Sequence, residues 1–187
     1  MADAMIGIAL FLAASLAIVR LSWRSLRCLR AHGFYRFFAF ELLAGLIVLN
    51  LSIWFRDPWS MRQIASYALG VISIALAVEG FRLLAKIGKP SHEVTQSTNL
   101  AFENTTKLVT SGAYRFIRHP LYASLLALVL CAWLKAPLSA LNIAMALAAA
   151  GCLLATALAE EKENIARFGA EYAEYLMHTR RFVPFLF

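Results

Sequence analysis

The sequence predicts an all-α integral membrane protein with about five transmembrane helices. Of its 187 residues, 61% are hydrophobic and only 16% are charged, whereas soluble domains carry about 25% charged residues. The mean hydropathy is correspondingly high, at +0.67. The apolar residues form runs close to the roughly 20 residues that a helix needs to cross a bilayer. About five such spans would use half or more of the chain, so we expect residues 1–187 to form a single domain.

Three of the predicted spans lie in the N-terminal part, residues 1–85, at about 4–19, 37–55 and 64–84. The first run follows an acidic residue and precedes several arginines, which is the reverse of a secretory signal peptide. Because basic residues favour the cytoplasmic side of a membrane, we expect the N-terminus to lie outside. The loop that ends at Arg36 and the segment 86–118 are then cytoplasmic.

The basic residues and the cysteines predict no further kind of site. The formal net charge of +7 comes from Lys and Arg that stand between apolar runs, where membrane orientation accounts for them, so nucleic-acid binding is not expected. The cysteines are odd in number and widely spaced: Cys28, Cys131 and Cys152. Neither a disulfide framework nor a metal site is therefore predicted.

The C-terminal part, residues 86–187, begins with a polar loop and continues as a predicted helical hairpin. Residues 88–106 are too polar for lipid and rich in turn-forming residues, which favours a loop. Two apolar spans should then form a tight hairpin, at about 118–134 and 138–159. Pro120 is acceptable in the first turn of a helix, and Gly151 should let the last span approach its neighbours closely.

A tail helix is predicted after the last span. The span should run on to Phe168, break at Gly169 and restart through residue 175. Large apolar side chains recur at helical spacing in this region, at Ile165, Phe168, Tyr172 and Tyr175. Such a face can lie on the membrane surface or close over a site.

Two polar clusters at the ends of the hairpin carry the residues most suited to chemistry. Residues 107–123, KLVTSGAYRFIRHPLYA, and 159–164, AEEKEN, should lie at the same depth, because the hairpin brings their helices together. A helix that starts near His119 would direct free N–H groups and its positive dipole end into the space between them. Glutamates 160 and 161 offer acceptors for an ammonium group, and Tyr114 and Tyr122 offer aromatic faces to a purine or a sulfonium cation.

Each of these residue types also has an ordinary role at a membrane surface. Arg and His extend toward headgroups, tyrosines form an aromatic belt, and glutamates are solvated. Their joint occurrence at one hairpin favours a cytoplasmic cofactor pocket. A ligand that carries both a carboxylate and an amine would suit it.

The same segments resemble a known family. LVTSGAYRFIRHPLYA, AEEKEN and FGAEYAEY followed by Pro184 are similar to the isoprenylcysteine carboxyl methyltransferase family and its prokaryotic relatives. These are membrane methyltransferases that use S-adenosyl-L-methionine, and the resemblance covers about residues 106–185. It implies that the cofactor is held by Lys107, Leu108, Val109, Tyr114, His119, Pro120, Leu121, Tyr122 and Glu160. A further polar residue that helps the cofactor in relatives falls on Asn99 or Gln96.

One departure from the family bears on the methyl acceptor. The resemblance implies an Arg four residues before Glu160, where it holds the carboxylate of a prenylated cysteine, but this chain has Thr156 there. An unpaired carboxylate is costly to desolvate. We therefore expect an acceptor without a free carboxylate, or one held by Arg180 or Arg181 in the tail.

Glu79 is a further candidate, because it stands three residues before Arg82 at the inner end of the third span. Ionisable residues within membrane segments are often functional and are usually paired. A purely structural ion pair at this spacing is an equal alternative.

The sequence thus predicts an S-adenosyl-L-methionine-dependent methyltransferase acting on an isoprenoid, prenyl-thiol or other lipid acceptor that enters from the bilayer. We expect it in a bacterial inner membrane, with the cofactor site and the C-terminus cytoplasmic. One alternative is an NADPH-dependent reductase of the sterol or steroid type, in which Arg115 and Arg118 would face phosphates. The other is a non-enzymatic membrane subunit, in which the same residues would lie at an interface without a role in catalysis.

Overall fold

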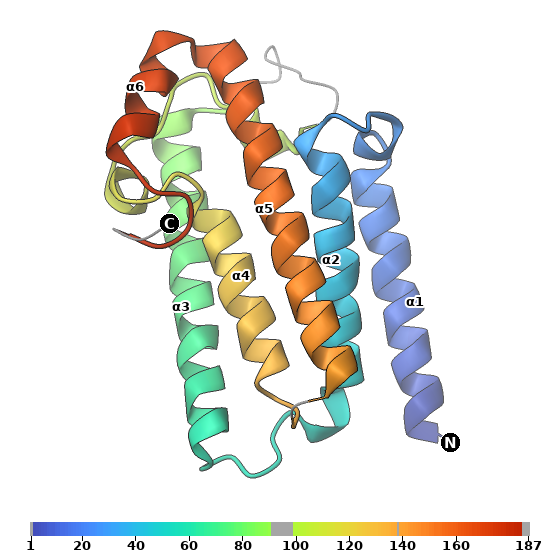
Figure 1. Cartoon of the computed structure of the whole chain (residues 1–187). Helices are drawn as coiled ribbons and strands as arrows, with labels where there is room; N and C mark the ends of the chain where they lie inside the picture. The colour runs from blue at the N-terminus through green and yellow to red at the C-terminus, as the bar shows by residue number, and fades with distance from the viewer. Residues whose placement is uncertain (1, 91–98, 138, 185–187) are drawn as a thin grey trace.

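The computed structural model describes residues 2–90, 99–137 and 139–184, and within them the chain is an all-α bundle without strands (Figure 1). The prediction of an all-α protein is confirmed. The α-helices are α1 Ala2–Ser22, α2 His32–Leu49, α3 Met61–Leu83, α4 Pro120–Trp133, α5 Ala140–Phe168 and α6 Ala170–His178. A π-helical turn at Leu84–Gly88 extends α3, and short 3₁₀ turns lie at Ser25–Arg27, Leu51–Ile53, Ala101–Glu103 and Gly112–Arg115.

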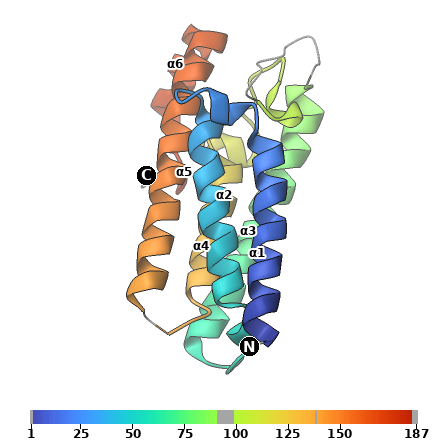
Figure 2. The same cartoon turned by 90° about the vertical axis from the view of Figure 1, so that its right-hand side faces the viewer.

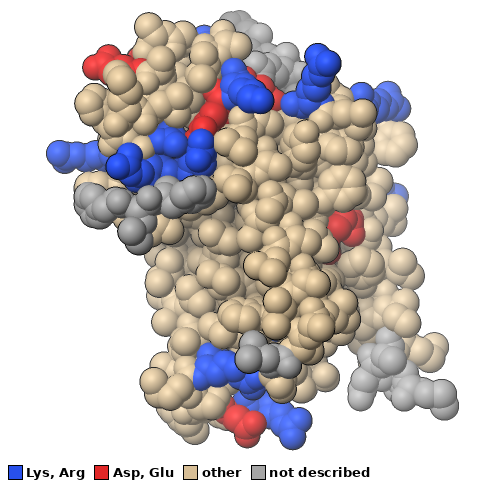
Figure 3. Space-filling view, viewed as in Figure 1, with Lys and Arg blue, Asp and Glu red and all other residues tan. Residues whose placement is uncertain are grey.

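Four helices of the described chain, α1, α2, α3 and α5, are long and apolar enough to cross a membrane. The fifth expected span, α4, has 14 residues and therefore a length of about 21 Å, which is less than a hydrocarbon core of roughly 30 Å. It is shorter than predicted because the residues before Pro120 form a 3₁₀ turn and irregular backbone. Figure 3 shows Lys and Arg gathered at the two ends of the bundle, with a broad and largely uncharged belt between them.

The second helix begins earlier than the hydropathy predicted. We expected a loop through Arg36, but α2 starts at His32, and both side chains are buried. They face inward because carboxylates from other elements neutralise them.

The bundle is organised by two closely packed helix pairs, α2 with α5 and α3 with α4, and α4 also packs on α5. The core between them is apolar, with Leu46, Val129, Ala149 and Leu153 at most 1% exposed. Helix α1 packs on α2 at the edge of the bundle (Figure 2). Most of its apolar side chains are exposed in the bundle, as expected for a helix that faces lipid.

Buried polar contacts close the end of the bundle where the hairpin turns. The Asn50 side chain donates to Asn142 Oδ1 at 2.9 Å and to the carbonyl of Ala132 at 3.0 Å. Lys135 donates to Gln63 Oε1 at 3.0 Å, and its Nζ lies 3.9 Å from the centre of the Tyr67 ring. These contacts tie the hairpin to α2 and α3, and the two polar clusters lie at the opposite end of α4 and α5.

Two glycines shape that opposite end. Gly169 has a φ of 61°, which breaks the chain between α5 and α6 as predicted. Gly112 has a φ of 59°, and a Cβ there would meet Leu83 Cδ1 at 2.7 Å and Glu79 Oε1 at 2.6 Å, so only glycine lets this turn approach α3. The predicted role of Gly151 is wrong, because it is exposed and a Cβ added to it would meet no atom within 4 Å.

The tail folds back over the loop that precedes α4. The N–H of Arg118 donates to the carbonyl of Arg180 at 2.7 Å, and the N–H of His119 donates to that of Arg181 at 3.1 Å. The Tyr175 hydroxyl on α6 donates to the carbonyl of Tyr114 at 2.5 Å. Of the two roles expected for the tail, closing over a site is therefore the one that the contacts favour.

Candidate active site

A cavity of about 280 Å³ lies beneath α6, at the end of the bundle away from the hairpin turn. Its volume is near the lower end of the range for small-molecule sites. The bundle helices α2, α3, α4 and α5 line it, together with α6 and the loop before α4. Its polar side chains include Arg36, Glu103, Tyr114, Arg118, His119, Tyr122, Glu160 and Asn164.

The cavity continues from this polar end as an apolar arm between α2, α3 and α4. The arm is lined by Phe40, Ala77, Phe81, Leu121, Leu125 and Leu128, with Ser73 furthest along α3. From Leu84 to Ser73 the lining follows α3 for about 16 Å. Helices α2 and α3 make no extensive contact with each other along their described lengths. An extended apolar chain would suit this arm.

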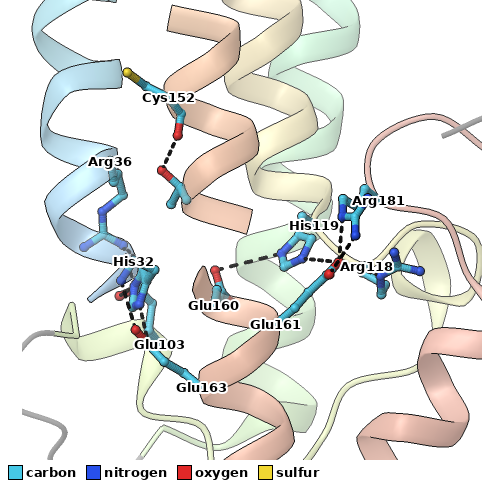
Figure 4. A network of polar contacts seen from close by, with 11 residues as sticks. His32, Arg36, Glu103, Arg118, His119, Cys152, Glu160, Glu161, Glu163 and Arg181 are labelled. Carbon is cyan, nitrogen blue, oxygen red and sulfur yellow. Dashed lines mark hydrogen bonds and ion pairs between the residues drawn. The ribbon is translucent and has the colours of Figure 1, made fainter. Parts of the chain in front are cut away.

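His119 is held at the polar end between two neighbouring carboxylates of α5 (Figure 4). Its Nδ1 lies 3.9 Å from Glu160 and its Nε2 lies 3.4 Å from Glu161, although Nε2 makes no hydrogen bond within the described residues. The imidazole stacks on the Tyr122 ring at a centroid distance of 5.4 Å. The predicted meeting of the two polar clusters is thus observed.

The two carboxylates have different surroundings, and only Glu160 lines the cavity. Glu161 is 7% exposed and pairs with Arg118 at 2.9 Å and with Arg181 at 3.1 Å. Among the described residues, no Arg or Lys pairs with Glu160. The expectation that both glutamates are available to a ligand ammonium is therefore wrong for Glu161, which the two arginines already neutralise.

A second polar cluster, which we did not predict from the sequence, joins α2 to α5 and to the loop before α4. Arg36 pairs with Glu103, and His32 lies between Glu103 at 3.3 Å and Glu163 at 2.6 Å (Figure 4). The sole sequence signal is the four-residue spacing of His32 and Arg36, which places them on one helix face. Their partners are 67 and 131 residues away in the sequence.

Glu103 is ionised in this cluster. Burial alone would raise the pKa of its carboxyl group, but the hydrogen bond with His32 and the charge of Arg36 hold that pKa below its ordinary value. The backbone N–H of Leu100 also donates a hydrogen bond to the Glu103 carboxylate, at 2.8 Å. Both carboxylate oxygens are thus occupied by contacts within the protein.

The hydroxyls of Tyr114 and Tyr175 stay protonated near neutral pH. Burial raises the pKa of Tyr114, and the negative charge of Glu160 raises it further. Burial also raises the pKa of Tyr175. Neither hydroxyl is therefore suited to act as a base near neutral pH.

Most of the predicted cofactor residues line the cavity: Leu108, Val109, Tyr114, His119, Leu121, Tyr122 and Glu160. Two do not. Lys107 is exposed, and Pro120 is buried at the first position of α4. The Asn99 Oδ1 is buried without a hydrogen-bond partner in the described chain, and Asn99 is not among the residues that line the cavity, although its neighbour Leu100 is. Gln96 lies outside the described residues.

The candidate acceptor residues are placed away from the cavity lining. Thr156 is 0% exposed, and its hydroxyl donates to the carbonyl of Cys152 at 2.7 Å. Arg180 is exposed, and Arg181 pairs with Glu161. Glu79 pairs with Arg82 at 2.7 Å, where both side chains are at least one-third exposed.

The helices and the cavity together define an integral membrane protein with an enzyme-like pocket, in which a polar chamber opens into an apolar arm within the bundle. A family model for the isoprenylcysteine carboxyl methyltransferase (ICMT) family matches residues 71–167, which is just over half of the chain. The chain belongs to this family and is a membrane methyltransferase. Searches of curated proteins and of solved structures gave no significant match.

Proposed function

We propose that the protein transfers a methyl group from S-adenosyl-L-methionine to a lipophilic acceptor within the membrane. The observation that carries this proposal is the shape of the cavity, whose polar end contains Glu160 and whose other part is an apolar arm between three helices. Members of the family use this cofactor. The two parts of the cavity match the two chemically different reactants.

The residues at the polar end fit the cofactor. Glu160 has no Arg or Lys partner in the described chain, so its carboxylate can receive an ammonium group. The stacked rings of His119 and Tyr122, together with Tyr114, offer aromatic faces. When bound, the cofactor supplies an electrophilic methyl group on a sulfonium. Leu108 and Val109 complete the set of residues that would hold it.

The protein's contribution to catalysis would be orientation and exclusion of water. Methyl transfer requires the two reactants to be aligned, and alignment alone can lower a barrier by several kcal/mol. Helix α6 covers the cavity with Tyr172 and Tyr175, which are 2% and 9% exposed. The hydrogen bond from Tyr175 to the carbonyl of Tyr114 fixes that cover in place.

The acceptor would enter from the bilayer between α2 and α3, where the apolar arm lies. The loop between α1 and α2, which contains Arg24, Arg27 and Arg30, lies at the same end of the bundle as α6 (Figure 1), and α6 lines the cavity. The excess of basic residues at that end supports a cytoplasmic location for it. We therefore propose that the enzyme lies in a bacterial inner membrane with its N-terminus outside.

The reductase alternative has less support. It requires Arg115 and Arg118 to face phosphates, but Arg115 is exposed outside this cavity. The Arg118 guanidinium is engaged by Glu161 and by the carbonyls of Leu176 and Thr179. Neither side chain is placed to neutralise a phosphate in the cavity.

Ligand binding to the purified protein in lipid nanodiscs tests the proposal. We expect calorimetry to detect saturable binding of S-adenosylhomocysteine and none of NADPH. Label from S-adenosyl-L-methionine should then pass into a bacterial lipid extract, and heat-denatured protein is the control. Binding of NADPH without S-adenosylhomocysteine would favour the reductase, and binding of neither would favour a non-enzymatic subunit.

A further inference from the structure

The segment from the last turn of α1 to the start of α2, residues 20–31, is strongly basic, and we call it the arginine loop. It contains no acidic residue, and its arginines are all exposed: Arg20, Arg24, Arg27 and Arg30. Within the described residues, none of these arginines forms an ion pair with Asp or Glu. The arginine loop therefore carries a local positive charge that the described chain does not compensate.

Large apolar side chains alternate with these arginines and are exposed as well. Leu21 is 55% exposed, Trp23 is 54% exposed and Leu29 is 66% exposed. The Arg27 guanidinium lies over the Trp23 ring, 5.2 Å from its centre. Trp is typical of the membrane–water interface, because its ring is apolar and its N–H is polar. A partner that fits the arginine loop must present both negative charge and hydrocarbon.

The backbone of the arginine loop forms a tight turn. Ser22 and Ser25 face inward and are each 2% exposed. The N–H of Cys28 donates to the carbonyl of Ser25 at 3.0 Å, and the N–H of Ala31 donates to that of Cys28 at 3.0 Å. A Cβ at Gly33 would meet Ser25 Cβ at 2.8 Å, so Ser25 packs directly on the first turn of α2. A preformed turn reduces the entropy lost when several arginines bind one ligand.

The arginine loop lies beside the part of the bundle that faces lipid. It follows α1, whose apolar side chains are mostly exposed and which packs on α2 at the edge of the bundle (Figure 2). Orientation in the membrane requires only the positive charge of such a loop. It requires neither an exposed Trp nor a fixed turn, whereas a surface that binds lipid uses both.

We propose that the arginine loop binds the headgroups of anionic phospholipids, such as phosphatidylglycerol, in the leaflet on the side of the cavity. Guanidinium groups form paired hydrogen bonds with phosphate oxygens, and the exposed apolar side chains would contact the acyl chains. A zwitterionic lipid cancels the charge of its phosphate with its own ammonium group, so the loop should prefer lipids with a net negative charge. This inference goes beyond the proposed function, because residues 20–31 do not line the cavity.

Quenching of Trp23 fluorescence measures lipid contact at the arginine loop. The other tryptophans, Trp54, Trp59 and Trp133, lie near the start of α3 and the end of α4, at the hairpin end of the bundle. The signal of Trp23 is obtained by comparison with Trp23→Phe. Protein in phosphatidylcholine nanodiscs is given spin-labelled phosphatidylglycerol or spin-labelled phosphatidylcholine in increasing mole fraction. We expect phosphatidylglycerol to reach the same quenching of Trp23 at about a tenfold lower mole fraction, because several arginines attract it together.

Two variants of equal charge separate the arginine loop from the rest of the basic surface. Arg20→Gln/Arg24→Gln/Arg30→Gln keeps the contact of Arg27 with Trp23, so the surroundings of the reporter within the protein are retained; it should lose the preference for phosphatidylglycerol. The control Lys86→Gln/Lys89→Gln/Arg180→Gln also removes three exposed charges, but outside the loop, and should keep the preference. Thermal unfolding in phosphatidylcholine nanodiscs checks that both variants are folded.

Equal quenching of Trp23 by the two lipids in the wild type would overturn the assignment. A preference that persists in the arginine-loop variant, or that disappears in the control, would do the same. A further arm adds inorganic phosphate at the concentration of the labelled lipid, and phosphatidylglycerol should stay bound. Its displacement by phosphate would show that the surface binds a soluble anion and not a lipid.

Discussion

Glu160 and Glu161 are adjacent in the sequence but should respond to the same mutation in different ways. Glu160 lines the cavity and is approached by His119 at 3.9 Å, without an Arg or Lys partner in the described chain. Glu161 is buried with Arg118 and Arg181. Replacing each by Gln keeps the size of the side chain and removes only the charge.

We expect Glu160→Gln to weaken cofactor binding and to leave the fold intact. Loss of one hydrogen bond to a charged group costs about 1.5–3 kcal/mol, which corresponds to about a 10- to 150-fold higher Kd. His119→Ala should weaken binding in the same direction, because it removes the ring that stacks on Tyr122. Thermal unfolding in nanodiscs should remain close to that of the wild type for Glu160→Gln.

Glu161→Gln should instead lower the stability. Removing one partner of a buried ion pair costs about 3–5 kcal/mol, and the lower end applies because the Arg181 side chain is 26% exposed and is partly screened by solvent. Calorimetry with S-adenosylhomocysteine and thermal unfolding are measured on both variants. Unchanged affinity in Glu160→Gln, or unchanged stability in Glu161→Gln, would refute our interpretation of these two carboxylates.

Three other predictions concern the loop, the second polar cluster and the topology. Gly112→Ala should cost about 1–3 kcal/mol in unfolding experiments, since its positive φ and its contact with Leu83 exclude a Cβ, whereas the control Gly151→Ala should be neutral or slightly stabilising. The lowered pKa of Glu103 means that its stabilising contribution is complete at neutral pH and is lost as the pH falls below the ordinary carboxyl value of 4.5. In Glu103→Gln the unfolding temperature should therefore decrease less steeply below that pH than in the wild type. The same dependence of unfolding temperature on pH in both proteins would contradict the ionised state of Glu103. The native Cys28, which is exposed in the loop predicted to be cytoplasmic, should react with an impermeant reagent only in permeabilised cells. A cysteine placed at Arg56 in a Cys28→Ser background should react in intact cells, and the reverse pattern would invert the topology.

Hydropathy and the hairpin were enough to predict most of the fold and the meeting of the two motifs. The third span was expected at 64–84 and is found at Met61–Leu83. Residues 107–123 and 159–164 meet because a hairpin places the start of one helix beside the end of the next. Such contacts follow from chain connectivity, so the sequence could predict them. The contacts of Arg36 and His32 join elements far apart in the sequence, and no pattern in the sequence indicated them.

The rotation of α5 decides which glutamate faces the cavity. Buried residues recur every four positions along this helix, at Ala149, Leu153 and Ala157, and the next position in that series is Glu161. Glu160 is displaced from this buried stripe by about 100° around the helix axis. The sequence alone does not reveal this stripe, because α5 is apolar on all sides within its membrane part. The packing of α2 along α5 is needed to identify the buried face.

The same geometry separates Thr156 from the cavity. Thr156 and Glu160 lie one turn apart on α5, but α2 packs along this helix and Thr156 is 0% exposed, whereas Glu160 lines the cavity. A long cationic side chain at position 156 would have to displace packed neighbours to reach that cavity. Arg36 on α2 does line the cavity, where it pairs with Glu103, which is itself held by His32. The charged groups around the cavity therefore depend on which face of each helix packs inward, so the residue at position 156 does not by itself decide them.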